Sequence, residues 1–138
     1  MMGILDLERF TSLSNEQCEI ILGMAENLQI IADLSQADIF IDCLLEEDNA
    51  SLIVAEAKPT TIVSLYKNSM LGQIAYEEME PGVLFSLKTG KPLFGSRGIT
   101  EERGIMQQDI VPIKDLYGET IAVLIKERQN LVIIRKYK

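Results

Sequence analysis

The first long hydrophobic pattern in the chain has the period of an α-helix. Apolar residues recur there on one helical face: Ile20, Ile21, Met24, Leu28 and Ile31. Ser14 is suited to the N-cap position, and Gln17, three residues later, completes a capping box. The pattern therefore predicts one amphipathic helix over residues 15–31, of about four or five turns. Residues 1–13 precede it as a lead-in.

The period changes to two after residue 38. Four apolar residues alternate with other side chains, as in a strand: Ile39, Ile41, Cys43 and Leu45. A polar turn over residues 46–49 separates this run from a second apolar run over residues 52–57. The pattern predicts a β-hairpin over residues 39–57, which ends at Pro59 because a proline cannot donate a hydrogen bond to a ladder.

The middle of the chain has no clear period. Residues 60–80 mix strand-forming and loop-forming side chains. Pro81 and Gly90 predict a short helix between them, because proline is favoured in the first helical turn and glycine just past the last one. Five turn-forming residues then predict a loop-rich stretch over residues 90–106: Gly90, Pro92, Gly95, Gly98 and Gly104.

Two alternating runs, residues 108–114 and 120–126, flank Asp115–Gly118 and predict a second hairpin. The element order is thus helix, hairpin, irregular segment, short helix, loop and hairpin. This order favours an α+β fold, with an antiparallel sheet and helices packed against it. We expect a single domain over residues 1–138, in which residues 129–138 form a tail or the start of a linker.

Composition and charge mainly exclude classes of partner and of catalysis. The 138 residues include 13 Lys+Arg and 21 Asp+Glu, which gives a net charge of −8 and a pI near 4.5. A chain this acidic is a poor non-specific binder of phosphate backbones and anionic lipid, so we expect no nucleic-acid or membrane partner. The chain has no His, and its two cysteines, Cys18 and Cys43, are isolated. We therefore expect no metal, no cofactor and no His-dependent catalysis.

No segment has the pattern of a membrane span or an export signal. The longest stretch without a charged residue has nine residues, Asn68–Tyr76, whereas a membrane-spanning helix needs roughly 20 apolar residues. The first ten residues already contain Asp6, Glu8 and Arg9, unlike a basic region followed by an apolar one. These features, with two isolated cysteines, predict a cytoplasmic protein.

Residues 57–108 hold most of the candidate chemistry. The segment is long, irregular and dense in hydrogen-bonding side chains, and loops on a rigid sheet are common sites for small ligands. We therefore expect a pocket beneath it. Catalysis has less support, because no serine has a visible base partner and the adjacent carboxylate pairs are typical of solvated surfaces. An enzyme would need a cleft of charged groups, for example Glu80 facing Arg97 or Lys67.

A series of short motifs carries a resemblance to a known family. In chain order the motifs are Ala32–Asp38 before a hydrophobic strand, Ala57–Thr61, Ser64–Tyr66, Gly72, Glu80–Pro81, Thr89–Pro92, Gly95–Gly98, Gln107–Gln108 with Val111–Ile113, and Gly118 with Ala122–Ile125. Their order and spacing over about residues 14–128 resemble the GAF-like N-terminal sensor domain of cytoplasmic sensor histidine kinases. That family includes the ethanolamine-responsive kinases of Firmicutes and a related mycobacterial soluble kinase.

The resemblance implies a GAF/PAS-like fold. In such a fold a central antiparallel sheet has the long N-terminal helix on one face, and an irregular segment, here residues 59–106, covers a ligand pocket on the other. The ligand would be a small polar molecule whose identity the sequence does not give. Five polar residues within the motifs are the candidates for lining the pocket: Thr60, Ser64, Tyr66, Arg97 and Gln108.

The resemblance also implies a role. The chain would be a ligand-sensing regulatory domain of a dimeric two-component kinase, whose catalytic domains lie outside these 138 residues and pass phosphate to a response regulator. The basic end at Lys138 is what a cut inside a linker would leave. The alternative is a ligand-free dimerisation or docking module of the same fold, which a filled pocket and a large apolar surface patch would favour.

Overall fold

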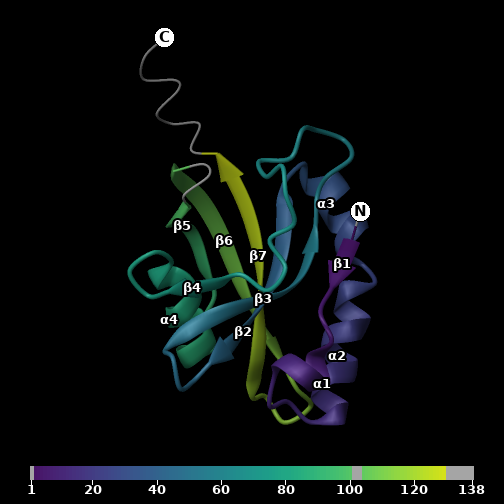
Figure 1. Cartoon of the computed structure of the whole chain (residues 1–138), viewed down its shortest axis with the longest axis vertical. Coiled ribbons are helices and arrows are strands. Elements are labelled where there is room, and N and C mark those ends of the chain that lie inside the picture. The colour runs from purple at the N-terminus through teal and green to yellow at the C-terminus, as the bar shows by residue number, and fades with distance from the viewer. Residues whose placement is uncertain (1, 101–103, 130–138) are drawn as a thin grey trace.

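The computed structural model describes residues 2–100 and 104–129, and Figure 1 shows how their elements are arranged. In chain order the elements are β1 (Met2–Ile4), α1 (Leu7–Phe10), α2 (Asn15–Ala25), α3 (Leu28–Ser35), β2 (Asp38–Leu45), β3 (Ala50–Ala57), β4 (Ile74–Tyr76), α4 (Pro81–Thr89), β5 (Leu93–Thr100), β6 (Gly104–Lys114) and β7 (Thr120–Gln129). This is the expected α+β class, and both predicted hairpins are present.

The strands form one seven-stranded sheet in which every pair is antiparallel. Their order is β1-β3-β2-β7-β6-β5, and β4 pairs with β3 beside this path. The two hairpins therefore meet where β2 pairs with β7, with Asp38 opposite Glu127 and Phe40 opposite Ile125. Strands from distant parts of the sequence thus lie side by side at the centre of the sheet.

Helices α2 and α3 cover one face of the sheet (Figure 1). Their buried side chains pack with those of Ile39, Ile41 and Cys43 of β2 in one apolar core. The single helix predicted over residues 15–31 is instead divided at Glu26 and Asn27, where the Asn27 amide bonds back only three residues, to Met24.

The division leaves the apolar pattern intact. The buried positions Ile21, Ala25, Leu28 and Ala32 continue from α2 into α3 at spacings of four, three and four residues. Both helices therefore keep an apolar face toward the same side of the sheet, which is why the sequence pattern does not reveal the division.

Helix α4 and the chain before it cover the other face of the sheet. We call residues 58–73, between β3 and β4, the cover segment. A second apolar core there joins Phe40 and Ile125 of the sheet to Val83 of α4 and to Tyr66 of the cover segment. The rings of Phe40 and Tyr66 meet edge to face with their centroids 5.6 Å apart. The bounds of α4 agree with the predicted helix, and Gly90 ends it at φ +71°.

The prediction of a loop-rich stretch over residues 90–106 is wrong. The described residues of this stretch include β5 and the first part of β6, so the cover is shorter than expected. Strand β5 lies at an edge of the sheet. Its glycines serve the strand: Gly95, at φ +71°, lies in the irregular register between Leu93 and Ser96. At Gly98 a Cβ would come 2.8 Å from the Gln108 side chain. The lack of a side chain at Gly98 therefore leaves space for the side chain of Gln108.

Candidate functional site

The face of the sheet beneath α4 and the cover segment contains buried polar groups. Along β2, Ile39 and Ile41 point to the α2 and α3 side, so the alternating positions Asp38 and Asp42 point to the α4 side. Glu127 of β7 lies opposite Asp38 in one direction and opposite Gln108 of β6 in the other. The register of three strands therefore brings acidic and amide side chains into one layer.

These groups form a connected buried cluster around Gln108. The Gln108 amide nitrogen donates to Glu80 Oε1 at 2.7 Å and to Glu127 Oε2 at 2.9 Å. The Tyr66 hydroxyl donates to Glu127 Oε1 from the cover segment. Asp42 lies close enough to both glutamates for their charges to act on it. We call Asp42, Glu80, Glu127, Gln108 and Tyr66 the carboxyl cluster; each is at most 7% exposed.

Burial dominates the electrostatics of this cluster. Desolvation, helped by the charge of Glu80, raises the pKa of Glu127 to about 7, although hydrogen bonds from Tyr66 and Gln108 oppose the rise. Desolvation also raises the pKa of Glu80 and, together with the two glutamate charges, raises the pKa of Asp42 well above its ordinary value. Near neutral pH the cluster therefore holds protons that the same side chains would lose in water.

The cluster contains more hydrogen-bond acceptors than donors. Among the described residues, two of its buried atoms have no hydrogen-bond partner, Asp42 Oδ1 and Gln108 Oε1, and a third buried atom without one, Ser86 Oγ, lies in α4. Ser86 lies fully buried in α4, which packs on this face of the sheet. A buried polar atom without a partner costs about 1–3 kcal/mol. Groups that lack a partner at such a cost indicate a place where a further donor is needed.

Carboxylates also hold the cover segment onto the sheet. Asp38 of β2 accepts from Ser64 Oγ at 2.5 Å and from the Leu65 amide at 2.9 Å. Glu56 of β3 accepts from Ser69 Oγ at 2.5 Å and from the Met70 amide at 2.8 Å. With the bond from Tyr66 to Glu127, three strands each contribute one such attachment. We call Asp38, Glu56 and Glu127 the three clasps.

The five candidate residues from the sequence lie in different settings. Tyr66 and Gln108 both bond to Glu127, inside the carboxyl cluster. Ser64 lies nearby, in the Asp38 clasp. Thr60 lies at the start of the cover segment, where its amide and hydroxyl bond to Asp33 Oδ1 of α3 at 2.6 and 2.9 Å. Arg97 is exposed on β5. The structure thus brings three of the five together.

Sequence reasoning missed the acidic members of the site. Asp42 and Glu127 sit inside apolar strands, where a polar residue in alternation is usually assigned to a solvated face. The available signal was that the same face of β2 also carries the large apolar residue Phe40. A strand face with both kinds of residue indicates a covered layer that contains buried polar groups. Glu80 was considered only as a partner for a cation, whereas it accepts a bond from Gln108.

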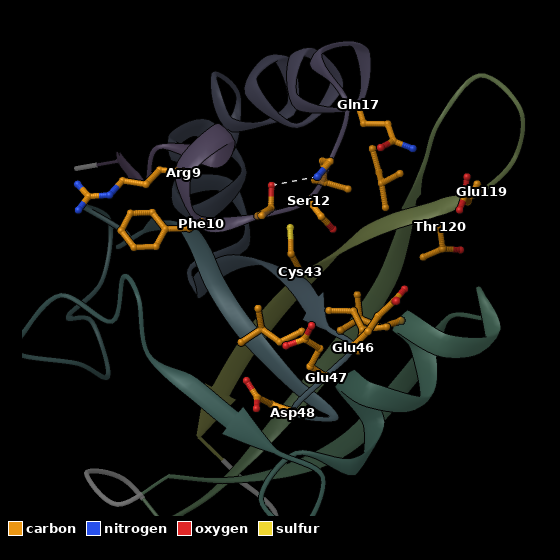
Figure 2. A pocket seen from close by; sticks show the side chains of 16 residues that line it. Arg9, Phe10, Ser12, Gln17, Cys43, Glu46, Glu47, Asp48, Glu119 and Thr120 are labelled. Carbon is orange, nitrogen blue, oxygen red and sulfur yellow. Dashed lines mark hydrogen bonds between the residues drawn. The ribbon is translucent and has the colours of Figure 1, made fainter.

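The described surface also has cavities away from this layer. Figure 2 shows one of about 540 Å³ between the loop after α1, the β2–β3 turn and the start of β7. Carboxylates of the turn and of Glu119 surround it, and Cys43 lies at its base. None of the five candidate residues lines this cavity or either of the two others described at the surface. The pocket expected beneath the cover segment stays a prediction.

The antiparallel sheet with helices on one face and a cover on the other has the fold of GAF domains. Similar solved structures include "Sensor region of a sensor histidine kinase", with TM-score 0.70 and 20% identity over 92% of this chain and 42% of that one. A GAF domain from an Acinetobacter phosphoenolpyruvate-protein phosphotransferase has TM-score 0.51 and 14% identity over 85% of this chain and 79% of that one. A PAS domain from Colwellia psychrerythraea has TM-score 0.49 and 16% identity over 80% and 96%.

A family model identifies the chain more narrowly. The model described as "Histidine kinase PdtaS, GAF domain" matches residues 6–136, so the chain belongs to this family of GAF domains. The match confirms the resemblance found in the sequence motifs. The chain spans less than half the length of the solved sensor region named above. A search among curated proteins gave no significant match. In the described residues no helix has both the length and the apolar character needed to cross a membrane.

Proposed function

We propose that this GAF domain binds a small polar ligand in the layer between the sheet and the cover segment. Occupancy would control autophosphorylation by kinase domains outside this chain. The observation that carries the proposal is the carboxyl cluster, with Asp42 Oδ1 and Gln108 Oε1 buried and without a partner in the described part of the chain. The three clasps join the same face of the sheet to the segment that would have to move, and one of them, Glu127, is a member of the cluster.

The chemistry of the unpartnered atoms limits the ligand. The amide carbonyl oxygen of Gln108 can only accept, so its missing partner must supply an N–H or O–H group. The nearby carboxyl groups of Glu80 and Glu127 disfavour an anion, since a like charge would be buried beside them. The proposal therefore expects a small uncharged or positively charged molecule rich in donors.

Signal transfer would follow the clasps. A ligand shifts an equilibrium only through different affinity for two states, and the two states proposed here are a closed and a loosened cover segment. Glu127 belongs both to a clasp and to the central strand β7, so a change at the cover reaches the middle of the sheet. The partners in this proposal are the remaining domains of a cytoplasmic kinase, a response regulator and a second copy of the chain.

Binding to the chain is the direct test. Thermal shift against small amines including ethanolamine, small amides, polyols and nucleotides, and against a cell metabolite extract, should give at least one compound that raises the unfolding midpoint. An isotope-labelled chain should then show that this compound shifts the side-chain amide signal of Gln108.

Matched variants localise the binding. Asp42→Asn keeps the shape of the side chain and changes the buried acceptor, so it should weaken binding by roughly tenfold or more, as expected for about 1.4 kcal/mol. Asp48→Asn, at an exposed carboxylate in the β2–β3 turn, should leave it unchanged. The proposal is wrong if neither the panel nor the extract moves the midpoint, or if both variants bind as the unchanged chain does.

A second candidate function, a docking or dimerisation module, has one observation in its favour. Three large apolar side chains are strongly exposed on α3 and the cover segment: Ile30 at 69%, Leu34 at 86% and Val63 at 89%. The bonds from Thr60 and Thr61 to Asp33 hold the two elements together there. Sedimentation of Leu34→Glu, with Leu116→Glu in the exposed β6–β7 turn as control, tests it: only the former should reduce self-association.

A further inference from the structure

We propose that the cover segment is a proton-controlled latch: it closes on the sheet when the carboxyl cluster holds protons and loosens when the cluster loses them. The inference is separate from the proposed ligand, since it concerns the empty domain. It stands on an arrangement in which the groups that fasten the segment are acids from three strands. One of these acids, Glu127, also belongs to the buried cluster.

Glu127 is surrounded by other acidic side chains. These acids face it from two sides: Asp38 and Asp42 from β2, and Glu80, which immediately precedes α4. In the described part of the chain, the groups that bond to it are uncharged, namely the Tyr66 hydroxyl from the cover segment and the Gln108 amide from β6. Deprotonation therefore places negative charges together in a layer from which water is largely excluded.

The two cations that flank Glu127 along its own strand bond to other groups. Lys126 and Arg128 flank Glu127 in β7, but Lys126 pairs with Asp109 at 3.1 Å and Arg128 donates to the carbonyl of Ser35. Lys58 acts on Asp38, at the edge of the layer. Glu56 adds a further negative charge to that clasp. A closed layer in which every acid is ionised is therefore destabilised by repulsion between like charges. Either protonation of the acids or opening of the layer relieves this repulsion.

Protons also satisfy the acceptors of the layer. A protonated carboxyl group is a donor as well as an acceptor, whereas a carboxylate can only accept. Asp42 Oδ1 and Gln108 Oε1 lack a donor in the described structure, and both lie beside acids that can supply one. Protonation of a carboxyl group thus removes a repulsion between like charges and supplies the donor of a hydrogen bond in the closed layer. When the layer opens, water solvates the charges and supplies the donors instead.

The direction of the effect follows from burial. A solvated glutamate has a pKa of roughly 4.3, whereas that of the buried Glu127 is about 7. Between these values the closed form holds about one more proton than a form in which Glu127 meets water, so the opening constant rises by up to about tenfold per pH unit. The cover can open without unpacking the opposite face of the sheet, where α2 and α3 pack through apolar side chains.

Amide hydrogen exchange on the chain measures the latch directly. The Leu65 and Met70 amides bond to the Asp38 and Glu56 clasps, so they report closure, and the amides of α2 report the opposite face. After correction for intrinsic rates, protection at Leu65 and Met70 should fall about thirtyfold from pH 5.5 to pH 8. At each pH it should be lower than that of the best-protected α2 amides, which report unfolding of the whole domain. Glu127→Gln should abolish most of this dependence, and Glu119→Gln, an exposed control, should keep it.

Three outcomes would overturn the latch. The first is protection at Leu65 and Met70 that does not depend on pH. The second is protection at Leu65 and Met70 as high as that of the best-protected α2 amides, which would mean that the cover opens only when the whole domain unfolds. The third applies even if Glu127→Gln fails to fold: carbon-detected titration of the unchanged chain should give a Glu127 carboxyl that titrates near pH 7, and titration below pH 5 would contradict the proposal. Ligand binding can fail its own test without affecting any of these measurements.

Discussion

The Tyr66 hydroxyl donates a hydrogen bond to the carboxyl group of Glu127, and this contact joins the irregular middle of the chain to the central strand of the sheet. The two residues are 61 positions apart in sequence. The Tyr66 ring also packs edge to face on Phe40, so one side chain has both an apolar and a polar attachment to the same face. Tyr66 is therefore the residue at which the stability of the cover segment is most easily probed.

Removing the Tyr66 hydroxyl should weaken the cover without emptying the core. Tyr66→Phe keeps the ring against Phe40 but leaves Glu127 with one donor fewer, which should cost about 1–2 kcal/mol of unfolding free energy. Urea denaturation at pH 7 measures the change. Tyr117→Phe is the control, because Tyr117 is 89% exposed in the β6–β7 turn and should have almost no effect. Equal stability of Tyr66→Phe and the unchanged chain would contradict the role given to this bond.

The unfolding free energy should decrease as the pH rises from about 5 to 7.5. The pKa of Glu127 is raised to about 7 in the folded chain, so the folded state holds more protons than the unfolded state within this range. The loss between pH 5.5 and pH 8 should be about 2 kcal/mol in urea titrations. Glu127→Gln should flatten the profile. A stability that increases over this range would show that Glu127 is ionised and well paired in the folded chain.

Two glycines offer a contrast in packing. A Cβ at Gly98 would lie 2.8 Å from the Gln108 side chain, so Gly98→Ala should displace that amide and cost about 1–3 kcal/mol. Gly23 lies inside α2 with nothing within 4 Å of the added carbon, so Gly23→Ala should stabilise the chain by about 0.5–1 kcal/mol. Thermal unfolding of both variants gives opposite signs if the described packing is correct.

The capping box at the start of α2 can be tested in isolation from the site. Ser14 Oγ accepts from the Gln17 amide at 3.2 Å, and Gln17 Oε1 accepts from the Ser14 amide at 3.0 Å. Ser14→Ala should cost about 1 kcal/mol of stability. Ser12→Ala, two residues earlier in the exposed loop, should cost little. If both variants unfold at the midpoint of the unchanged chain, the cap contributes nothing measurable to the fold.

Local signals predicted much of the fold. The Ser14 capping box, the two hairpins and the helix between Pro81 and Gly90 depend on neighbouring residues, and all are present. The strand at residues 93–100 was missed because its glycines were taken as loop signals. They are used there for an irregular register and for the close approach of Gln108, which only the neighbouring strand explains.

The candidate site was less predictable because it depends on strand register. Tyr66 and Gln108 were proposed from motifs, but their shared partner Glu127 was not, since nothing near it in sequence distinguishes it from a surface acid. Asp42 and Glu80 became members of the site only through the pairing of β2 with β7 and the packing of α4 on the sheet. Such long-range relationships are absent from periodicity and spacing.

The pairing of β2 with β7 has a consequence for how the domain assembles. Each hairpin pairs strands that are close in sequence, but the acids beneath the cover come from both, and they meet only after two segments more than 60 residues apart have joined. Contacts over such distances form slowly because a long loop must first be closed. The layer that excludes water from Glu127 therefore comes together late in folding. A newly made chain would form its helices and turns before it acquired the chemistry of its interior.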